Sequence, residues 1–133
     1  MMVDSSVWID YLYHNQHSDI CDYLDRYLEG EKPIFCTPII LQEVLQGIKK
    51  DSDFKRIRQN FLAYQFFQFD NQLQAAQDAA SIFRACRKKG FTIRKAYDCL
   101  IALTCLHFDL ELLHIDKDFD HIASLYPLKI VSV

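Results

Sequence analysis

The sequence predicts an α/β fold in which helices cover both faces of a parallel sheet. Short apolar runs that are typical of strands alternate with longer stretches whose apolar residues recur at helical spacing. Because a helical stretch separates each strand from the next, the strands are expected to run parallel. The chain has 133 residues, of which 50% are hydrophobic, and only 3 Gly and 3 Pro leave little room for linkers. We therefore expect residues 1–133 to form one domain.

The chain opens with a strand at residues 1–3 that stops at Asp4. A helix follows, for which Ser5 or Ser6 is a natural N-cap. Its expected apolar face comprises Val7, Trp8, Tyr11 and Leu12. After a polar break, residues 18–29 predict a second helix that ends at Gly30. Asp4 thus lies where a strand gives way to a helix.

The middle of the chain predicts a strand at residues 33–36, followed by helices. Thr37 with Pro38 predicts the start of a helix over residues 39–50, since Thr is a favoured N-cap and Pro a favoured first helical residue. Residues 51–66 predict a further helix, and residues 66–69 are either its end or a short strand. A long helix over residues 71–89 comes next and ends at Gly90. Its expected core side consists of Leu73, Ala76, Ala80 and Phe83.

The last third of the chain contains the most apolar helix, at residues 96–108. A strand at residues 110–115, a short helix at 118–125 and a final strand at 128–133 follow it. The helix is apolar on almost all sides, which predicts that it is buried.

Composition excludes several classes of protein. No apolar stretch approaches the roughly 20 residues that span a bilayer, so no membrane association is expected. The N-terminus lacks the basic segment of a signal peptide. The five cysteines are scattered without a Cys-x-x-Cys pair, which argues against a disulfide framework and against a zinc site. This cysteine usage favours the reducing cytoplasm.

Two basic clusters stand out in a chain whose net charge is -3. One lies at residues 49–58. The other comprises Arg84, Arg87, Lys88, Lys89, Arg94 and Lys95. Such clusters either bind phosphate groups locally or are solvated helix faces, and the residues alone do not decide between these interpretations.

Four carboxylates lie where parallel strands would bring them together. Asp4 and Asp116 each follow a predicted strand, whereas Glu43 and Asp98 lie in the first turns of predicted helices. Ligands of open α/β sheets bind at that edge of the sheet. Taken singly, each acid also has an ordinary explanation, which is helix capping for the aspartates and solvent exposure for the glutamate.

The combination of these acids indicates a metal site. Several carboxylates share a site only if a cation offsets their repulsion, and Mg²⁺ or Mn²⁺ prefers oxygen ligands. Such an ion activates water as a nucleophile and stabilises negative charge on a phosphate during in-line displacement. From the residues alone, the inference stops at metal-dependent phosphoryl chemistry.

The chain also resembles the PIN domain and, more narrowly, the VapC-type toxins of bacterial and archaeal toxin–antitoxin pairs. The resemblance rests on Val3-Asp4-Ser5-Ser6-Val7-Trp8-Ile9-Asp10, Glu43 with Gly47, Asp98-Cys99-Leu100-Ile101-Ala102 and Asp116-Lys117-Asp118-Phe119. It implies a parallel sheet of about five strands and an endoribonuclease that depends on Mg²⁺ or Mn²⁺. By this resemblance Asp4, Asp98 and Asp116 would hold the metal, and Glu43 would orient the metal or its water. Ser6 and Asp118 would support these catalytic residues.

The same resemblance implies three partners: a second copy of the chain in a homodimer, a cognate antitoxin, and an RNA substrate. Transfer RNA is the substrate class that it suggests. Either the cluster at residues 49–58 or the second cluster is expected to hold RNA phosphates, and the residues selected from the second are Arg84, Arg87, Lys88, Arg94 and Lys95. The aromatic segment at residues 61–69 either meets the antitoxin or packs in the core.

Some points of the sequence leave alternatives open. His114 stands where the family commonly has Thr or Ser, two residues before the fourth acid. It either packs at the strand end or hydrogen-bonds to Asp116 or to phosphate. A haloacid-dehalogenase-like phosphatase would want a second acid at the position of Ser6, which counts against that function. A non-catalytic interaction module with the same fold is the other alternative.

Overall fold

The computed structural model describes all 133 residues and contains a five-stranded sheet. The strands are β1 (Met2–Val3), β2 (Phe35–Cys36), β3 (Gln65–Phe66), β4 (Glu111–Leu113) and β5 (Lys129–Ile130). The helices are α1 (Ser5–Ile9), α2 (Ser18–Glu29), α3 (Pro38–Gln46), α4 (Asp51–Leu62), α5 (Gln72–Lys88), α6 (Ala96–Phe108) and α7 (Lys117–Leu125), with a π-helical turn η1 (Asp10–His14) after α1. The strands pair in the order β3-β2-β1-β4-β5, and every pairing is parallel, which confirms the predicted fold class.

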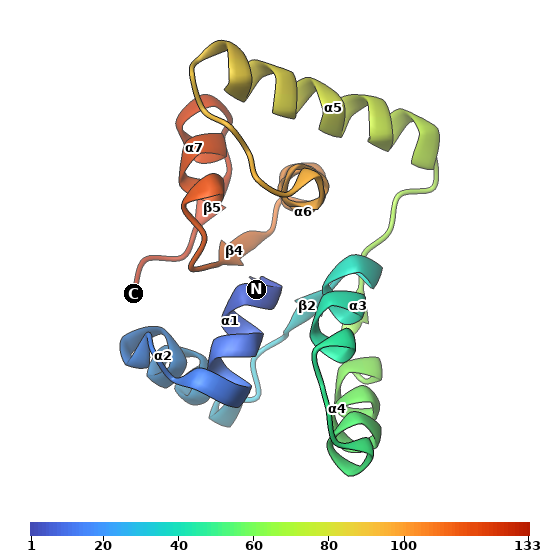
Figure 1. The fold of residues 1–133 in the computed structure, drawn as a ribbon, viewed down its shortest axis with the longest axis vertical. Helices are drawn as coiled ribbons and strands as arrows, with labels where there is room; N and C mark the ends of the chain where they lie inside the picture. Colours follow the sequence, from blue (N-terminus) through green and yellow to red (C-terminus); the bar gives the residue numbers. More distant parts are fainter.

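Helices cover both faces of the sheet (Figure 1). On one side α5 crosses the molecule and packs on α6, which lies between α5 and the sheet. On the other side lie α1 and α2. None of the helices is both long and apolar enough to cross a membrane. The crossover helices follow from the parallel pairing, since parallel strands cannot be joined by tight hairpins.

The core is built around β1, the central strand of the sheet. Met2 and Val3 are fully buried, and so are Leu112 of β4 and Ile101 of α6. Strands that are covered by helices on both faces have no solvent side, which explains why residues 1–3 show a continuous apolar run without alternation. The most apolar helix of the sequence, α6, is buried as predicted.

Two predicted helices extend too far. The helix that starts at Pro38 ends at Gln46, with Gly47 as its C-cap, four residues short of the predicted end at 50. The helix predicted over residues 51–66 ends at Leu62. Gln65 and Phe66 instead form the edge strand β3, because their backbone groups pair with β2. The pairing shows that Phe66 belongs to a short strand and not to the end of the helix.

The predicted core side of α5 is wrong for three of its four residues, whereas Phe83 is half-buried and packs against the core as predicted. Leu73 is 80% exposed, and Ala76 and Ala80 are also exposed. The residues that pack inward are Ala75, Ala79, Ile82 and Cys86. Both sets have the spacing of a helical stripe, so periodicity alone could not choose between them. Contact with α6 makes the choice.

Candidate active site

All four predicted acids lie at the carboxyl edge of the sheet. Asp4 follows β1 directly, Glu43 lies in α3 after β2, Asp98 lies in the first turn of α6, and Asp116 follows β4. Strands β1 and β4 are neighbours, and at this pair the order of the strands along the chain reverses. In open α/β sheets the crevice for ligands forms at such a reversal.

Asp4 is buried and caps the first helix. One of its oxygens, Oδ2, accepts the backbone N–H of Ser6 at 3.0 Å and also the Ser6 hydroxyl. The predicted N-cap, Ser5 or Ser6, is therefore wrong, because the carboxylate of Asp4 takes that role. The other oxygen, Oδ1, is buried without a hydrogen-bond partner. Burial raises the pKa of Asp4, the two hydrogen bonds from Ser6 oppose the rise, and the charge of Glu43 adds to it.

Glu43 is held by a residue that sequence reasoning did not select. The hydroxyl of Ser5 donates a hydrogen bond to Oε2 of Glu43. Ser5 is only 3% exposed, although it stands in a polar run at the start of a helix. The sequence feature that could have indicated this role is the pair of serines after Asp4. The hydroxyl of Ser5 donates to Glu43, and the hydroxyl of Ser6 donates to Asp4.

Asp98 has the most unusual surroundings of the four acids. It is 3% exposed, and its Oδ2 atom has no hydrogen-bond partner. It does not cap its helix, because the N-cap position of α6 is Lys95. Burial, together with the charges of Asp4 and Asp116, raises the pKa of Asp98 to about 7. A buried carboxylate without a partner is costly unless a cation or a proton compensates it.

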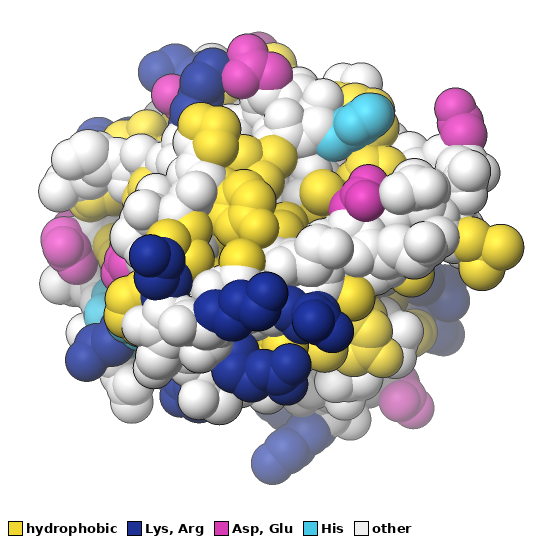
Figure 2. All heavy atoms as spheres, turned by 90° about the horizontal axis from the view of Figure 1, so that it is seen from above, with side chains coloured by type: hydrophobic (Ala, Val, Ile, Leu, Met, Phe, Trp, Pro, Cys, Tyr) yellow, Lys and Arg dark blue, Asp and Glu magenta, His cyan; other side chains and the backbone are white.

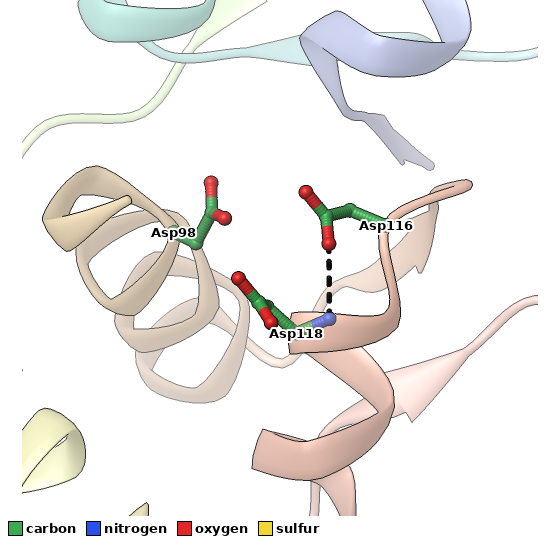
Figure 3. A group of neighbouring side chains, drawn as sticks. All are labelled: Asp98, Asp116 and Asp118. Atoms are coloured by element: carbon green, nitrogen blue, oxygen red, sulfur yellow. Dashed lines mark hydrogen bonds between the residues drawn. The ribbon is translucent and has the colours of Figure 1, made fainter. Parts of the chain in front are cut away.

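Asp116 and Asp118 form a hydrogen-bonded pair at the start of α7. The Oδ1 atom of Asp116 accepts the backbone N–H of Asp118 at 3.1 Å. One oxygen from each of Asp98, Asp116 and Asp118 lies within 4.8 Å of the others. Figure 3 shows the three side chains pointing toward one another from α6, the loop after β4 and α7. Asp118 was expected in a supporting role, yet it belongs to this closest group of acids.

Arg94, in the loop before α6, pairs with two of these acids. Its guanidinium Nη2 donates to Asp116 Oδ1 at 2.7 Å, and its Nε lies 3.6 Å from Asp118 Oδ2. Burial by itself would raise the pKa of Asp116, but the Asp118 N–H and the Arg94 guanidinium outweigh burial and lower it. A polar cavity of about 570 Å³ opens beside the pair, and Ser6 and His121 also line it.

The other predicted phosphate-binding residues do not touch the acids. Arg84, Arg87 and Lys88 are exposed on α5, and Lys95 is exposed at the start of α6. Figure 2, a view from the α5 side, shows Lys and Arg side chains gathered in a band on this face. Within the first basic cluster, Arg56 pairs with Asp53 on the same helix.

His114 packs at the end of β4. Its side chain is 5% exposed, and its ring centroid lies 5.2 Å from that of Phe119. Its nearest carboxylate belongs to Asp120, at 3.3 Å from Nε2, in a contact that lacks hydrogen-bond geometry. No hydrogen bond joins His114 to Asp116, so the packing interpretation agrees with the structure.

The residues present fit a hard divalent cation. Asp98, Asp116 and Asp118 form the closest group of acids, and the atoms with which they could bind a metal are all carboxylate oxygens. Two buried carboxylate oxygens, on Asp4 and Asp98, have no hydrogen-bond partner in the protein. Oxygen ligands with several negative charges are the donor set that Mg²⁺ and Mn²⁺ prefer.

A second cavity, of about 470 Å³, lies between α3, α5 and α6 and contains none of the four acids. Apolar residues line more than half of it, among them Phe67, Phe69 and Leu100. The two cavities therefore differ in character: one lies beside the carboxylate cluster, whereas the other is a mainly apolar groove.

A parallel sheet with buried carboxylates at its carboxyl edge defines a class of α/β proteins whose sites suit divalent cations. The chain belongs to the PIN domain family, whose model matches residues 1–125. It is 29% identical over 134 residues to VapC ribonuclease Mb1587 of Mycobacterium bovis, a match that covers 99% of this chain and 98% of that protein. Ribonuclease VapC11 of Mycobacterium tuberculosis matches with the same identity and coverage.

Solved structures share the fold over nearly the whole chain. VapBC2 from Rickettsia felis, bound to a DNA fragment from its promoter, has a TM-score of 0.71 at 18% identity and covers 98% of this chain and 96% of that one. VapBC-1 from nontypeable Haemophilus influenzae has a TM-score of 0.70 at 18% identity, with 98% and 95% covered. At this level of identity the likeness establishes the fold.

Proposed function

We propose that this protein is a metal-dependent endoribonuclease that acts as the toxin of a toxin–antitoxin pair. The observation that carries the proposal is the group of buried, incompletely paired carboxylates at the carboxyl edge of a PIN-domain sheet. Relatives of similar length that are named VapC ribonucleases support the substrate class. Cleavage of transfer RNA is the finer form of this proposal.

Asp4, Asp98, Asp116 and Asp118 would hold Mg²⁺ or Mn²⁺, and Glu43 would orient the ion or its water. When bound, such an ion would ionise a water molecule and neutralise charge on the phosphate that is cut. The chain's own residues prepare this chemistry. Ser5 and Ser6 fix the Glu43 and Asp4 carboxylates by donating a hydrogen bond to each, so that neither must be ordered when substrate arrives.

The surface around the acids is suited to RNA. Arg94, Lys117 and His121 line the polar cavity beside Asp116 and Asp118, so the groups around this cavity would suit the anionic backbone of RNA. Arg84, Arg87 and Lys88 on α5 add exposed positive charge farther from the acids. Basic groups that surround an acidic centre attract the backbone while the acids act on one phosphodiester.

An antitoxin and a second copy of the chain are the proposed protein partners. Two of the solved structures with this fold are VapBC proteins. The apolar groove between α3, α5 and α6 offers a surface for a hydrophobic segment of such a partner. The aromatic segment at residues 61–69 divides between core and groove. The ring centroid of Phe61 lies 4.8 Å from that of Trp8 in the core, whereas Phe67 and Phe69 line the groove.

The phosphatase alternative gains no support. At the position where that mechanism would want a second acid, the hydroxyl of Ser6 donates to Asp4. Asp4 itself is buried and engaged as a helix cap, which is a poor setting for a nucleophile that must meet a substrate.

The test is incubation of the purified chain with total cellular RNA in the presence of Mg²⁺, Mn²⁺ or EDTA, with products mapped by end sequencing. Asp98→Asn removes the charge of the least paired acid, and Asp22→Asn is the matched control on the exposed side of α2. We expect discrete cuts that require metal, persist in Asp22→Asn and fall at least a hundredfold in Asp98→Asn.

Absence of cutting by the folded wild-type chain in every metal would contradict the ribonuclease and favour the interaction module. Equal cutting by wild type and Asp98→Asn would place the active site elsewhere. The mapped ends would also identify the substrate, since cuts confined to transfer RNA are what the finer proposal requires.

A further inference from the structure

We propose that Arg94 is a built-in competitor for the metal site: its guanidinium pairs with two of the three acids that would hold a divalent cation, and so limits the affinity for the cation. The inference rests on the proposed metal site but not on the ribonuclease activity. It assigns Arg94 a role other than the phosphate contact expected from the sequence.

The contacts of Arg94 are directed at the acids. Its Nη2 lies 2.7 Å from Asp116 Oδ1, and this same oxygen also accepts the Asp118 backbone N–H. Its backbone N–H donates to Asp118 Oδ2 at 2.9 Å, which ties the loop before α6 to the start of α7. Arg94 therefore contacts both acids: its side chain pairs with Asp116 and Asp118, and its backbone N–H also donates to Asp118.

The two ends of this interaction differ in their exposure. The Arg94 side chain is 69% exposed, whereas the side chains of Asp116 and Asp118 are 10% and 6% exposed. A guanidinium that reaches buried acids from the solvent side can leave without unpacking the core. The two acids are fixed in place, because Asp116 is the N-cap of α7 and Asp118 is buried in the first turn of that helix.

One arginine does not balance the charges at this site. One oxygen from each of Asp98, Asp116 and Asp118 lies within 4.8 Å of the others, and Arg94 pairs with only the last two. Asp98 Oδ2 stays buried and without a partner. The neighbouring cations Lys95 and Lys117 are exposed and form no ion pair with the group. A divalent ion would satisfy all three acids together, and for two of them it would compete with the guanidinium of Arg94.

The consequence is a measurable competition. In the metal-free protein Arg94 stabilises the acids, and this stabilisation opposes cation binding because the guanidinium and the cation compete for the same two carboxylates. Because the guanidinium is mostly exposed, its contribution is modest, and we expect its removal to tighten cation binding by about fivefold. Arg94→Lys keeps the charge but loses the planar fork, so its affinity for the cation should lie between wild type and Arg94→Gln.

The experiment is titration of the full chain with Mn²⁺, followed by calorimetry and by the electron paramagnetic resonance signal of free Mn²⁺. Wild type, Arg94→Gln and Arg94→Lys are compared at one ionic strength. Arg84→Gln is the matched control, since it removes the same charge from an exposed position that forms no ion pair with the acids. We expect the Kd for Mn²⁺ to fall about fivefold in Arg94→Gln and to stay at the wild-type value in Arg84→Gln.

Equal affinity of wild type and Arg94→Gln would overturn the proposal, as would weaker binding by Arg94→Gln, which would mean that Arg94 orders the acids for the cation. An equal gain in affinity for Mn²⁺ in Arg84→Gln would mean that the effect comes from net charge alone, and this would also overturn the proposal. If wild type and all variants bind no Mn²⁺, both the competition and the metal site fail. Tight Mn²⁺ binding with the expected Arg94 effect, but without RNA cleavage, would sustain this inference and refute the ribonuclease.

Discussion

Asp98 shows how strongly one residue of this protein depends on its neighbours. In the sequence it is an acid near a helix start, for which capping is the ordinary explanation. In the fold it is buried, caps nothing and has one oxygen without a partner. Burial and the charges of Asp4 and Asp116 raise its pKa to about 7, so in the metal-free protein this acid keeps its proton to a much higher pH than an ordinary aspartate does.

The raised pKa of Asp98 predicts a dependence of stability on pH. Because the folded value of about 7 exceeds the ordinary value of 3.8, the folded state binds the extra proton between these values. The metal-free protein should therefore lose stability from this group as pH rises from 3.8 to 7, by on the order of 2–4 kcal/mol. Asp116, whose pKa is lowered, contributes in the opposite direction, since its stabilisation is lost as pH falls.

Urea unfolding of metal-free wild type and Asp98→Asn at several pH values measures the Asp98 contribution. Asn resembles the protonated acid, so we expect Asp98→Asn to be the more stable form near pH 7, with the difference disappearing toward 3.8. A difference in the free energy of unfolding that does not change with pH would contradict the assignment.

At the scale of elements, α5 shows what periodicity can and cannot decide. The length of the helix and its end at Gly90 were predicted within about a residue. Gly90 has a φ of 87°, a left-handed conformation that glycine adopts without strain. The buried face was predicted wrongly, because an alanine-rich helix offers two stripes with the same spacing. The stripe that faces α6 is buried.

Two neighbouring alanines test the face of α5. Ala79 is 8% exposed, whereas Ala80 is exposed. We expect Ala79→Leu to lower the free energy of unfolding by about 1–3 kcal/mol through overpacking, and Ala80→Leu to change it by less than about 0.5 kcal/mol. Urea unfolding of both variants gives the comparison. Equal effects would mean that α5 does not pack on α6 through this stripe.

At the scale of the whole molecule, the site exists only in the folded chain. Its acids come from the end of β1, from α3, from α6 and from the start of α7, which are distant in sequence. The sheet order places β1 beside β4 and so brings Asp4 and Asp116 to one crevice. A cation held by such a group binds the native state and not the unfolded chain, so it must stabilise the fold.

This linkage predicts that Mn²⁺ or Mg²⁺ raises the Tm of the protein. At a cation concentration of 100 times Kd, the free energy of unfolding should rise by about 2.7 kcal/mol. The rise should persist in Asp22→Asn, which is exposed on α2, and be greatly reduced in Asp98→Asn. Thermal unfolding with and without EDTA measures it. An equal rise in all three forms would indicate cation binding outside the acid group.

The sequence by itself determined the alternation of strands and helices, the parallel sheet and the four acids at strand and helix ends. These features depend on local patterns: α2 and α6 match their predicted bounds, because the helical spacing of the apolar residues in α2 and the continuous apolar run of α6 both lie within the elements themselves. The tertiary structure alone decided the strand β3, the face of α5 and the contacts that Ser5 and Arg94 make with distant acids. These depend on residues far apart in the chain, as in the pairing of Gln65 with Phe35, the contact of Ser5 with Glu43 and the contact of Arg94 with Asp116. A local sequence pattern cannot predict such contacts, because the two residues come close together only when the chain folds.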